Sequence, residues 1–395
     1  MFRMAVGHSD DIDVDAALTA VLAECDAALA GVAPTAGLLF AAWEADHQHV
    51  LDAVRSHYPG IALAGSSSGG EMTSVMGFQQ DSIALAVFAS DDIDITVGLG
   101  RNLAVDPQAV IREAVAGARA PTSQPPTLCI VMPTIGVIDA SIILDGLRAE
   151  LGPDVPIVGG GATARDPVMD PAATSGLQFA NDSVIDGGIA LLLFSGPLDY
   201  SFGVETGWRG VGPRATITRA GPGRVLEIDG RPAVEFFNRY VGTAPGQPPP
   251  IANPLAVFAT PDATEFYLRT ATALDHGTGE VAFFGSVPEG STVQLTVAAT
   301  DDILDGATAS ISDALARFPA GGTPGGALLY SCVVRRFLLG TRTGREMEAV
   351  QAIVGTATPV AGFYCMGEIA PFLDGGSSKF HNATMVSVLL GSHRA

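Results

Sequence analysis

Short apolar runs recur along the chain and fall into three stretches of the same form. The first stretch contains GLLFAAW (37–43), IALAGSSSGGEM (61–72) and DSIALAVF (81–88). The second contains TLCIVMPT (127–134), PIVGGGATA (156–164) and GGIALLLF (187–194). The third contains ALLYSCVV (327–334), PVAGFYCMGEIA (359–370) and TMVSVLL (384–390). Runs of this length, rich in Val, Ile, Leu and Phe and bounded by turn residues, predict buried β-strands.

Apolar residues recur at helical spacing over 18–29, 50–58 and 304–318, which predicts three amphipathic helices. Thr343 and Glu346 have the capping-box spacing of a helix that runs to about residue 354. Strands alternating with helices predict an α/β protein: mixed β-sheets flanked by helices, built from about three strand-helix-strand-loop-strand repeats in two halves. In the first and third stretches the loop before the last strand is too short for a crossover helix, so we expect that strand to be antiparallel.

A change of composition near residues 209–223, which are rich in Gly, Pro and Arg, predicts a boundary between the halves. We therefore expect one domain over 1–215 and another over 224–395. Residues 243–254 read TAPGQPPPIANP, and their prolines predict an exposed, extended loop.

Composition narrows the class of function. The chain has 395 residues, 47% of them hydrophobic, which is enough apolar material for two or three domains. The formal net charge is −21, so the chain lacks the clustered cations that bind nucleic acid or an anionic membrane surface. Lys379 is the only lysine, which disfavours Schiff-base and P-loop chemistry. We predict neither nucleic-acid binding nor membrane insertion.

Cysteine and histidine spacing predicts no metal site. Four widely separated cysteines form no Cys-x-x-Cys pair, which suits a reducing cytoplasm rather than a disulfide framework. The N-terminal segment becomes acidic within ten residues, and it lacks the apolar segment that is typical of a signal peptide. We therefore expect a cytoplasmic protein, with no metal unless His381 ligates haem.

The glycine-containing loops supply the first candidate site residues. Ser67 stands at the centre of GSSSG, which matches the nucleophile-elbow pattern, although the segment that follows has no helical face. A Gly/Ser turn between two strands is the simpler interpretation. Glu71 and Glu368 hold matching places after the first and third loops, where a carboxylate could hold a ligand amine or bond to loop amides. The second loop has no matching acidic residue.

Further candidates come from the third stretch. Arg335 and Arg336 follow a strand, where a guanidinium could hold a carboxylate or form a structural ion pair. His381 and Asn382 precede the last apolar strand, and His381 could donate, accept, ligate haem or simply hold the strand end.

These segments resemble the FIST family over nearly the whole chain. GLLFAAW, AGSSSGGEM and DSIALAVF are similar to a FIST N domain over 1–215. VLEIDGRPAVEFFNRYVG, LLYSCVVRRFLLGTRTGREMEAV, PVAGFYCMGEIAPF and FHNATMVSVLL are similar to a FIST C domain over 224–395. Family members often carry cysteine where this chain has Ser66, which removes a thiol from that position.

The resemblance implies a bacterial sensor of intracellular signal transduction that binds a small ligand, such as an amino acid, and acts through a separate partner. A histidine kinase or a cyclic-dinucleotide enzyme is the implied kind of partner. The first alternative is a haem-binding nitric oxide sensor with a histidine axial ligand; the second is a hydrolase that uses Ser67 or Cys365. No cofactor is predicted unless haem is bound. The expected ligand site contains Ser66, Ser67, Glu71, Arg335, Arg336, Tyr364, Cys365, Glu368, His381 and Asn382.

Overall fold

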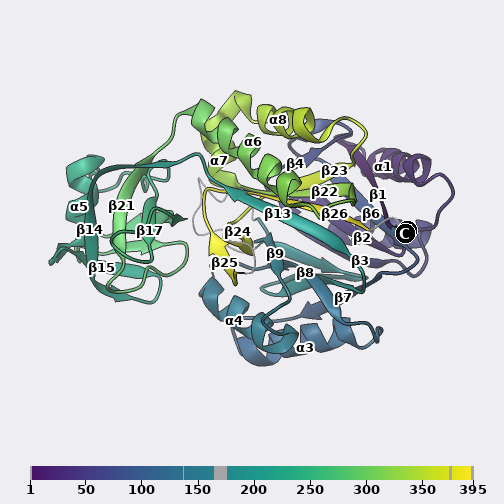
Figure 1. Ribbon diagram of the computed structural model, residues 1–395, viewed down its shortest axis with the longest axis horizontal. Helices are drawn as coiled ribbons and strands as arrows, with labels where there is room; N and C mark the ends of the chain where they lie inside the picture. The colour runs from purple at the N-terminus through teal and green to yellow at the C-terminus, as the bar shows by residue number, and fades with distance from the viewer. Residues whose placement is uncertain (1, 137, 164–175, 373–375, 393–395) are drawn as a thin grey trace.

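The computed structural model describes residues 2–136, 138–163, 176–372 and 376–392. Three six-stranded mixed sheets and one larger antiparallel sheet form the molecule, which confirms the α/β class with mixed sheets. Figure 1 shows the larger sheet at one end of the molecule, with helices α3 and α4 on one side of the rest and α6 and α8 on the other.

The three six-stranded sheets are as follows. The first has the order β1 (Phe2–Ser9), β6 (Ile83–Ser90), β2 (Ala36–Ala42), β3 (Ala62–Ser68), β10 (Leu177–Ala180), β11 (Ser183–Asp186). The second has the order β25 (Ser378–His381), β24 (Glu368–Pro371), β9 (Ile157–Gly160), β8 (Pro126–Pro133), β12 (Ile189–Ser195), β7 (Asp94–Gly100). The third has the order β13 (Asp199–Glu205), β26 (Met385–Ser392), β22 (Thr323–Cys332), β23 (Val360–Cys365), β4 (Glu71–Thr73), β5 (Gly77–Gln79).

In each six-stranded sheet, one edge is formed by a β-hairpin from another of the three stretches. The hairpin β4–β5 leaves the first sheet and pairs with β23 of the third. The hairpin β10–β11 pairs with β3 of the first sheet, and β24–β25 pairs with β9 of the second. This cyclic exchange covers one edge of every sheet and ties the three sheets together, because an uncovered strand edge leaves unpaired backbone groups.

Helices cover the outer faces of the sheets. They are α1 (Val14–Leu29), α2 (His47–His57), α3 (Pro107–Arg119), α4 (Ala140–Leu151), α6 (Thr300–Arg317), α7 (Val333–Leu339), the 3₁₀ turn η1 (Gly340–Arg342) and α8 (Gly344–Val354). The helices predicted from apolar spacing are present, and β6 and β26 are antiparallel to β2 and β22, as expected. The predicted capping box is wrong: the Thr343 hydroxyl donates to Gly340 O at 2.6 Å, and the Glu346 carboxylate bonds to Arg335.

The inner faces of the three sheets meet in one apolar core. Phe40 of the first sheet stacks on Phe363 of the third, with ring centroids 4.4 Å apart. Phe88 of the first sheet contacts Phe194 of the second edge to face at 5.7 Å. All four side chains are essentially inaccessible to solvent. Burial of aromatic rings from all three sheets supplies much of the hydrophobic stabilisation that holds them together.

A β-subdomain is inserted between β13 and α6. Its strands are β14 (Arg209–Gly221), β15 (Arg224–Ile228), β16 (Arg231–Pro232), β17 (Leu255–Phe258), β18 (Phe266–Arg269), β19 (Ala271–Leu274), β20 (Val281–Phe283) and β21 (Thr292–Val297), with helix α5 (Ala233–Tyr240). The Gly- and Pro-rich segment at the predicted boundary forms β14, whose pairing shifts register between Val211 and Ala215. β14 pairs with β15 on one side and with β21 on the other, and so belongs to the sheet of the inserted subdomain.

None of the helices in the described ranges is long and apolar enough to cross a membrane.

Candidate functional site

The three glycine-containing loops meet in a closed ring of backbone hydrogen bonds. The first and third loops are joined by Gly69 N to Tyr364 O and Tyr364 N to Gly70 O, both 2.9 Å. The first and second are joined by Thr163 N to Ser67 O at 3.0 Å. The second and third are joined by Gly161 N to Gly367 O at 3.0 Å and Met366 N to Gly161 O at 2.9 Å. The loops therefore satisfy one another's backbone groups.

One glycine in this ring is required by its geometry. Gly367 has a φ of +80°, and a Cβ there would lie 2.3 Å from the ring of Phe380. A side chain at this position would have to displace Phe380 and adopt a left-handed conformation as well. The tight approach of the third loop to β25 depends on that glycine.

The serines of the first loop point into protein rather than into an open cleft. Ser67 Oγ donates to Thr163 O at 2.7 Å and accepts from Leu177 N at 2.8 Å. Ser66 Oγ is buried and has no hydrogen-bond partner among the described residues. Cys365 Sγ donates to Glu368 at 3.5 Å, and burial raises the pKa of this thiol well above its ordinary value.

Neither candidate nucleophile bonds to a histidine in the part of the chain that the structure describes. A nucleophilic serine or cysteine needs a neighbouring base or a lowered pKa. The geometry therefore gives the hydrolase alternative no support.

Glu71 and Glu368 have a counterpart in the second stretch that the sequence analysis missed. The register pairs are Glu71 with Phe363, Gln178 with Ser66 and Glu368 with Gly160. In each case the strand partner directly follows a glycine of its own strand, so Gln178 holds the matching place. Residues 164–175, which precede it, lie outside the described residues. This long spacing hid Gln178, because the other two residues follow their loops directly.

These three side chains make the same connection. Each bonds to the residue just before the last strand of its own stretch: Glu71 to Ser82 Oγ, Gln178 to Gly188 N, Glu368 to Thr384 N and Oγ1. We call Glu71, Gln178 and Glu368 the hairpin braces. Burial raises the pKa of both Glu71 and Glu368 to about 7, and hydrogen bonds from neighbouring hydroxyl groups act in the opposite direction. Full burial and repeated bonding support a structural role.

Arg335 is linked to the loop ring through Glu346 and Tyr364. Its guanidinium donates to Glu346 Oε1 from Nη2 at 2.6 Å and from Nε at 2.8 Å, and both side chains are fully buried. Tyr364 Oη donates to the other oxygen of Glu346 at 2.6 Å. Of the two interpretations of Arg335 offered above, a ligand contact or a structural ion pair, these bonds fit the structural ion pair. Arg336 instead donates to Gly69 O and so contacts the first loop directly.

His381 lines a pocket on another side of the third loop. The pocket has a volume of about 240 Å³ and lies between the end of β13, strand β18 of the inserted subdomain and the hairpin β24–β25. His381 Nε2 donates to Ala370 O at 3.0 Å, which leaves Nδ1 as an acceptor. Nδ1 is buried and has no partner among the described residues. Asn382 is not free in the same way, because its Oδ1 accepts from Thr270 N and its Nδ2 donates to His381 O.

The electrostatics of this pocket favour a hydrogen-bond donor. Burial lowers the pKa of His381 to about 4, and the charges of Arg269 and Lys379 lower it as well, so the imidazole is neutral at physiological pH. Glu205 also lines the pocket, and burial raises the pKa of its carboxyl. Phe266 and Phe372 supply aromatic walls, and the Phe372 ring stacks on His381 at 5.9 Å.

The His381 environment does not fit haem. Nε2, the usual axial nitrogen, is engaged by Ala370 O. The adjoining pocket of about 240 Å³ is below the usual range of roughly 300 Å³ and above for drug-sized ligands, which are themselves smaller than a haem macrocycle. We found no group of three or more His, Cys, Asp or Glu side chains able to hold a metal ion among the described residues.

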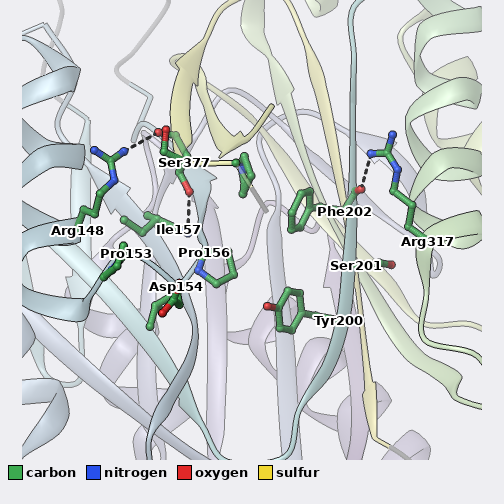
Figure 2. A pocket seen from close by; sticks show the side chains of 14 residues that line it. Arg148, Pro153, Asp154, Pro156, Ile157, Tyr200, Ser201, Phe202, Arg317 and Ser377 are labelled. Carbon is green, nitrogen blue, oxygen red and sulfur yellow. Dashed lines mark hydrogen bonds between the residues drawn. The ribbon is translucent and has the colours of Figure 1, made fainter. Parts of the chain in front are cut away.

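A second pocket, of about 280 Å³, lies on the other side of the hairpin β24–β25 (Figure 2). Arg148 and Arg317 project from opposite walls, and Tyr200 lies between them. Arg148 donates to Ser378 O at 3.2 Å, and Arg317 donates to Phe202 O at 3.5 Å. The pocket separates α4 and β9 from β13 and α6, so the two arginines come from different helices, Arg148 from α4 and Arg317 from α6.

Comparison with known proteins finds two family models that match the chain. The FIST N domain matches residues 35–231, and the FIST C domain matches residues 233–371. A crystal structure of cyanuric acid hydrolase from A. caulinodans covers 100% of both chains at 10% sequence identity and a TM-score of 0.38. That TM-score supports no inference about this chain. No curated protein matches it.

The two matches define a protein with a FIST N part and a FIST C part. The chain belongs to the FIST family, since the two domains together cover most of its length. FIST domains are associated with small-ligand sensing in signal transduction.

Proposed function

We propose that this chain is a cytoplasmic sensor that binds a small amine-bearing metabolite, with an amino acid as the first candidate, in the pocket beside His381. The unpartnered Nδ1 atom of His381 carries the proposal. A buried polar atom without a partner is destabilising, so a ligand N–H or O–H group at this position would stabilise the bound state. The lack of a partner among the described residues suits a site completed by a ligand.

The rest of the pocket supports a small cationic or zwitterionic ligand. Three carboxylates, Glu205, Glu265 and Asp313, line it against one cation, Arg317, which pairs with Asp313. The aromatic rings of Phe266 and Phe372 can contact an ammonium group through their faces. Its volume suits a metabolite of few heavy atoms. The loop ring carrying Ser66, Ser67, Tyr364 and Cys365 then acts as the support that fixes the third loop.

Signal output is proposed to pass to a separate protein in a bacterial cell. A histidine kinase or a cyclic-dinucleotide enzyme is the proposed kind of partner. The pocket lies between the inserted subdomain and the sheets, so a ligand there contacts both bodies. Binding can change the population of their arrangements only by its differential affinity for them.

The test is calorimetric titration of the purified chain with the twenty amino acids and related amines, supported by thermal melting. A ligand present at 100 times its Kd stabilises the folded state by about 2.7 kcal/mol, which melting detects. We expect His381→Gln and Glu205→Gln each to weaken binding about tenfold, because a hydrogen bond between charged or polar partners is lost.

His49→Gln is the matched control, because His49 is a half-exposed histidine on α2 that bonds to Asp15 and lies outside the pocket. It should bind like the unmodified chain. Glu205→Gln keeps the test decisive if His381→Gln fails to fold. If no amine in the panel stabilises the protein, or if all three variants bind equally well, the proposal is wrong.

A further inference from the structure

A third pocket, of about 290 Å³, lies where three parts of the molecule meet. Helix α4 contributes its first turns from Ala140 to Arg148, the inserted subdomain contributes Tyr267 and Arg269, and β25 contributes Lys379. Figure 1 shows β25 next to α4 on the side that faces the inserted subdomain. The pocket shares Arg148 with the groove of Figure 2 and Tyr267 with the His381 pocket.

Arg269 is a buried cation whose backbone partners carry no formal charge. Arg269 is only 8% exposed to solvent. Nε donates to Ser286 O at 3.2 Å, and Nη1 donates to Leu268 O and Phe380 O at 2.9 and 3.0 Å. No acceptor among the described residues bonds to Nη2, whose two N–H groups remain available. A buried charge of this kind needs a counter-charge to offset its lost hydration.

The nearby carboxylates are already engaged. Asp139 influences Arg269 electrostatically, but its Oδ1 caps α4 through Ser141 N, and its Oδ2 accepts from Ser286 Oγ. Asp145 pairs with Arg148 at 2.9 Å. Neither carboxylate forms an ion pair with Arg269 in the described structure.

Lys379 adds a second available cation. Its side chain is exposed at the rim, and no carboxylate of the described residues pairs with it. Basic residues are scarce in this acidic chain, which has 21 of them and a net charge of −21. Three of them, Arg148, Arg269 and Lys379, line this one pocket. The start of α4 also directs its positive dipole end to the same place.

We propose that this pocket is a binding site for a small oxyanion, namely the carboxylate or phosphate group of a metabolite. Nη2 of Arg269 would donate to the anion from the buried wall, and Lys379 would approach it from the rim. The aromatic rings beside Arg269 hold the guanidinium in place: its carbon lies 4.4 Å from the Tyr267 ring centroid and 5.7 Å from that of Phe380.

An anion in this pocket would join the inserted subdomain to the sheets. Arg269 belongs to β18 of that subdomain, whereas α4 and β25 belong to the second sheet and its cover. The site is distinct from the amine site proposed at His381. An effector could therefore act here whether or not the His381 pocket takes an amine.

The single lysine makes a direct test practical. An amine-reactive acetylating reagent can modify one side-chain amine in this chain, and mass spectrometry of the Lys379 peptide gives its rate of modification. We expect inorganic phosphate or succinate to slow that reaction at least about fivefold at saturation, relative to sodium chloride of equal ionic strength. Phosphate and succinate are tested separately, since they distinguish a phosphate ligand from a carboxylate ligand.

Titration calorimetry of the same anions tests the residues. We expect Lys379→Gln to weaken binding about tenfold and Arg269→Met to abolish it, since each removes a charged hydrogen-bond donor. Arg345→Gln is the matched control, because it removes one positive charge from an exposed residue of α8 that pairs with Glu348. Lys379 is exposed, so Lys379→Gln stays informative if Arg269→Met fails to fold.

Protection of Lys379 by neither anion would overturn the proposal, as would equal loss of affinity in Lys379→Gln and Arg345→Gln. His381→Gln should leave anion binding unchanged. If the chain binds anions but no amine, the amine site at His381 is wrong and the anion site stands. If it binds an amine but no anion, the anion site is wrong and the amine site stands.

Discussion

At the scale of single residues, Arg335 determines how the inserted subdomain is attached. Nη1 donates to Thr206 O at 2.6 Å, just before the insertion, and Nη2 donates to Ile303 O at 2.8 Å, just after it. The same guanidinium pairs with the buried Glu346 carboxylate. One side chain thus ties both ends of the insertion to α8. This arrangement supports a structural role for Arg335 within the predicted ligand set.

Replacing Arg335 with Met should destabilise the folded protein by about 3–5 kcal/mol, because it leaves the Glu346 carboxylate buried without its counter-charge. Chemical denaturation measures the change in the free energy of unfolding. The double variant Arg335→Met, Glu346→Gln should recover part of the loss, because no uncompensated buried charge remains.

Arg345→Met gives the comparison at an exposed ion pair. Arg345 and Glu348 are both more than 60% exposed, so the expected loss is below about 0.5 kcal/mol. Equal losses for Arg335→Met and Arg345→Met would contradict the structural role given to Arg335.

At the scale of elements, local patterns predicted most strands and helices but not the way hairpins are exchanged. Apolar runs and helical spacing depend on neighbouring residues, and they located β2, β3, β8, β22 and α6. The pairing of β4 with β23 joins segments nearly 290 residues apart, and no local pattern records it. The same reason explains the omission of Gln178, since only strand register shows that it matches Glu71.

Candidate site residues show a similar division. The expected ligand site contained residues of the first and third glycine loops, and backbone hydrogen bonds join these two loops in the structure. Arg269 was not considered, because its importance comes from burial and from carbonyl partners that include Ser286 O and Phe380 O, which lie elsewhere in the sequence. A lone arginine at the end of a short strand carries no sequence signal of that environment.

The hairpin braces lead to a prediction about pH. The folded-state pKa of Glu71 is about 7, above its ordinary value of 4.5, so the folded state binds one more proton than the unfolded state between these values. Stability from this group is therefore fully present below about pH 4.5 and is lost as pH rises to about 7. The loss is on the order of 3 kcal/mol.

Glu71→Gln should remove that dependence, because an amide has no proton to lose. Glutamine is already accommodated at the matching position of the second stretch, where Gln178 accepts from Gly188 N at 2.9 Å. Denaturation from pH 4.5 to 8 should show the variant gaining stability relative to the unmodified chain as pH rises. Ser90→Ala, a change at the end of β6, serves as a control and should follow the unmodified profile. Parallel profiles for Glu71→Gln and the unmodified chain would contradict the assigned protonation.

At the scale of the whole molecule, polar contacts and an apolar cluster join the inserted subdomain to the sheets in the part of the chain that the structure describes. Arg269 donates to Phe380 O, Thr270 N donates to Asn382 Oδ1, and Ser286 Oγ donates to Asp139. Trp208 and Leu268 belong to the apolar cluster at this junction. Both proposed ligand pockets border the same junction, so its opening is the motion that ligand binding is best placed to control.

Asn382→Ala should loosen this junction without unfolding the sheets. The change removes the acceptor for Thr270 N, and a lost hydrogen bond of about 1 kcal/mol corresponds to about fivefold more frequent local opening. Hydrogen exchange followed by mass spectrometry should therefore show faster exchange in β18 and β19, with β1 and β6 unchanged. Asn238→Ala, on the exposed side of α5, should leave exchange in β18 and β19 unaltered. A ligand at either pocket should slow exchange in β18 of the unmodified chain, because each pocket takes part of its lining from that strand.

If Asn382→Ala speeds exchange everywhere, the subdomain and the sheets open as one unit, and a sensor mechanism based on their relative movement is excluded.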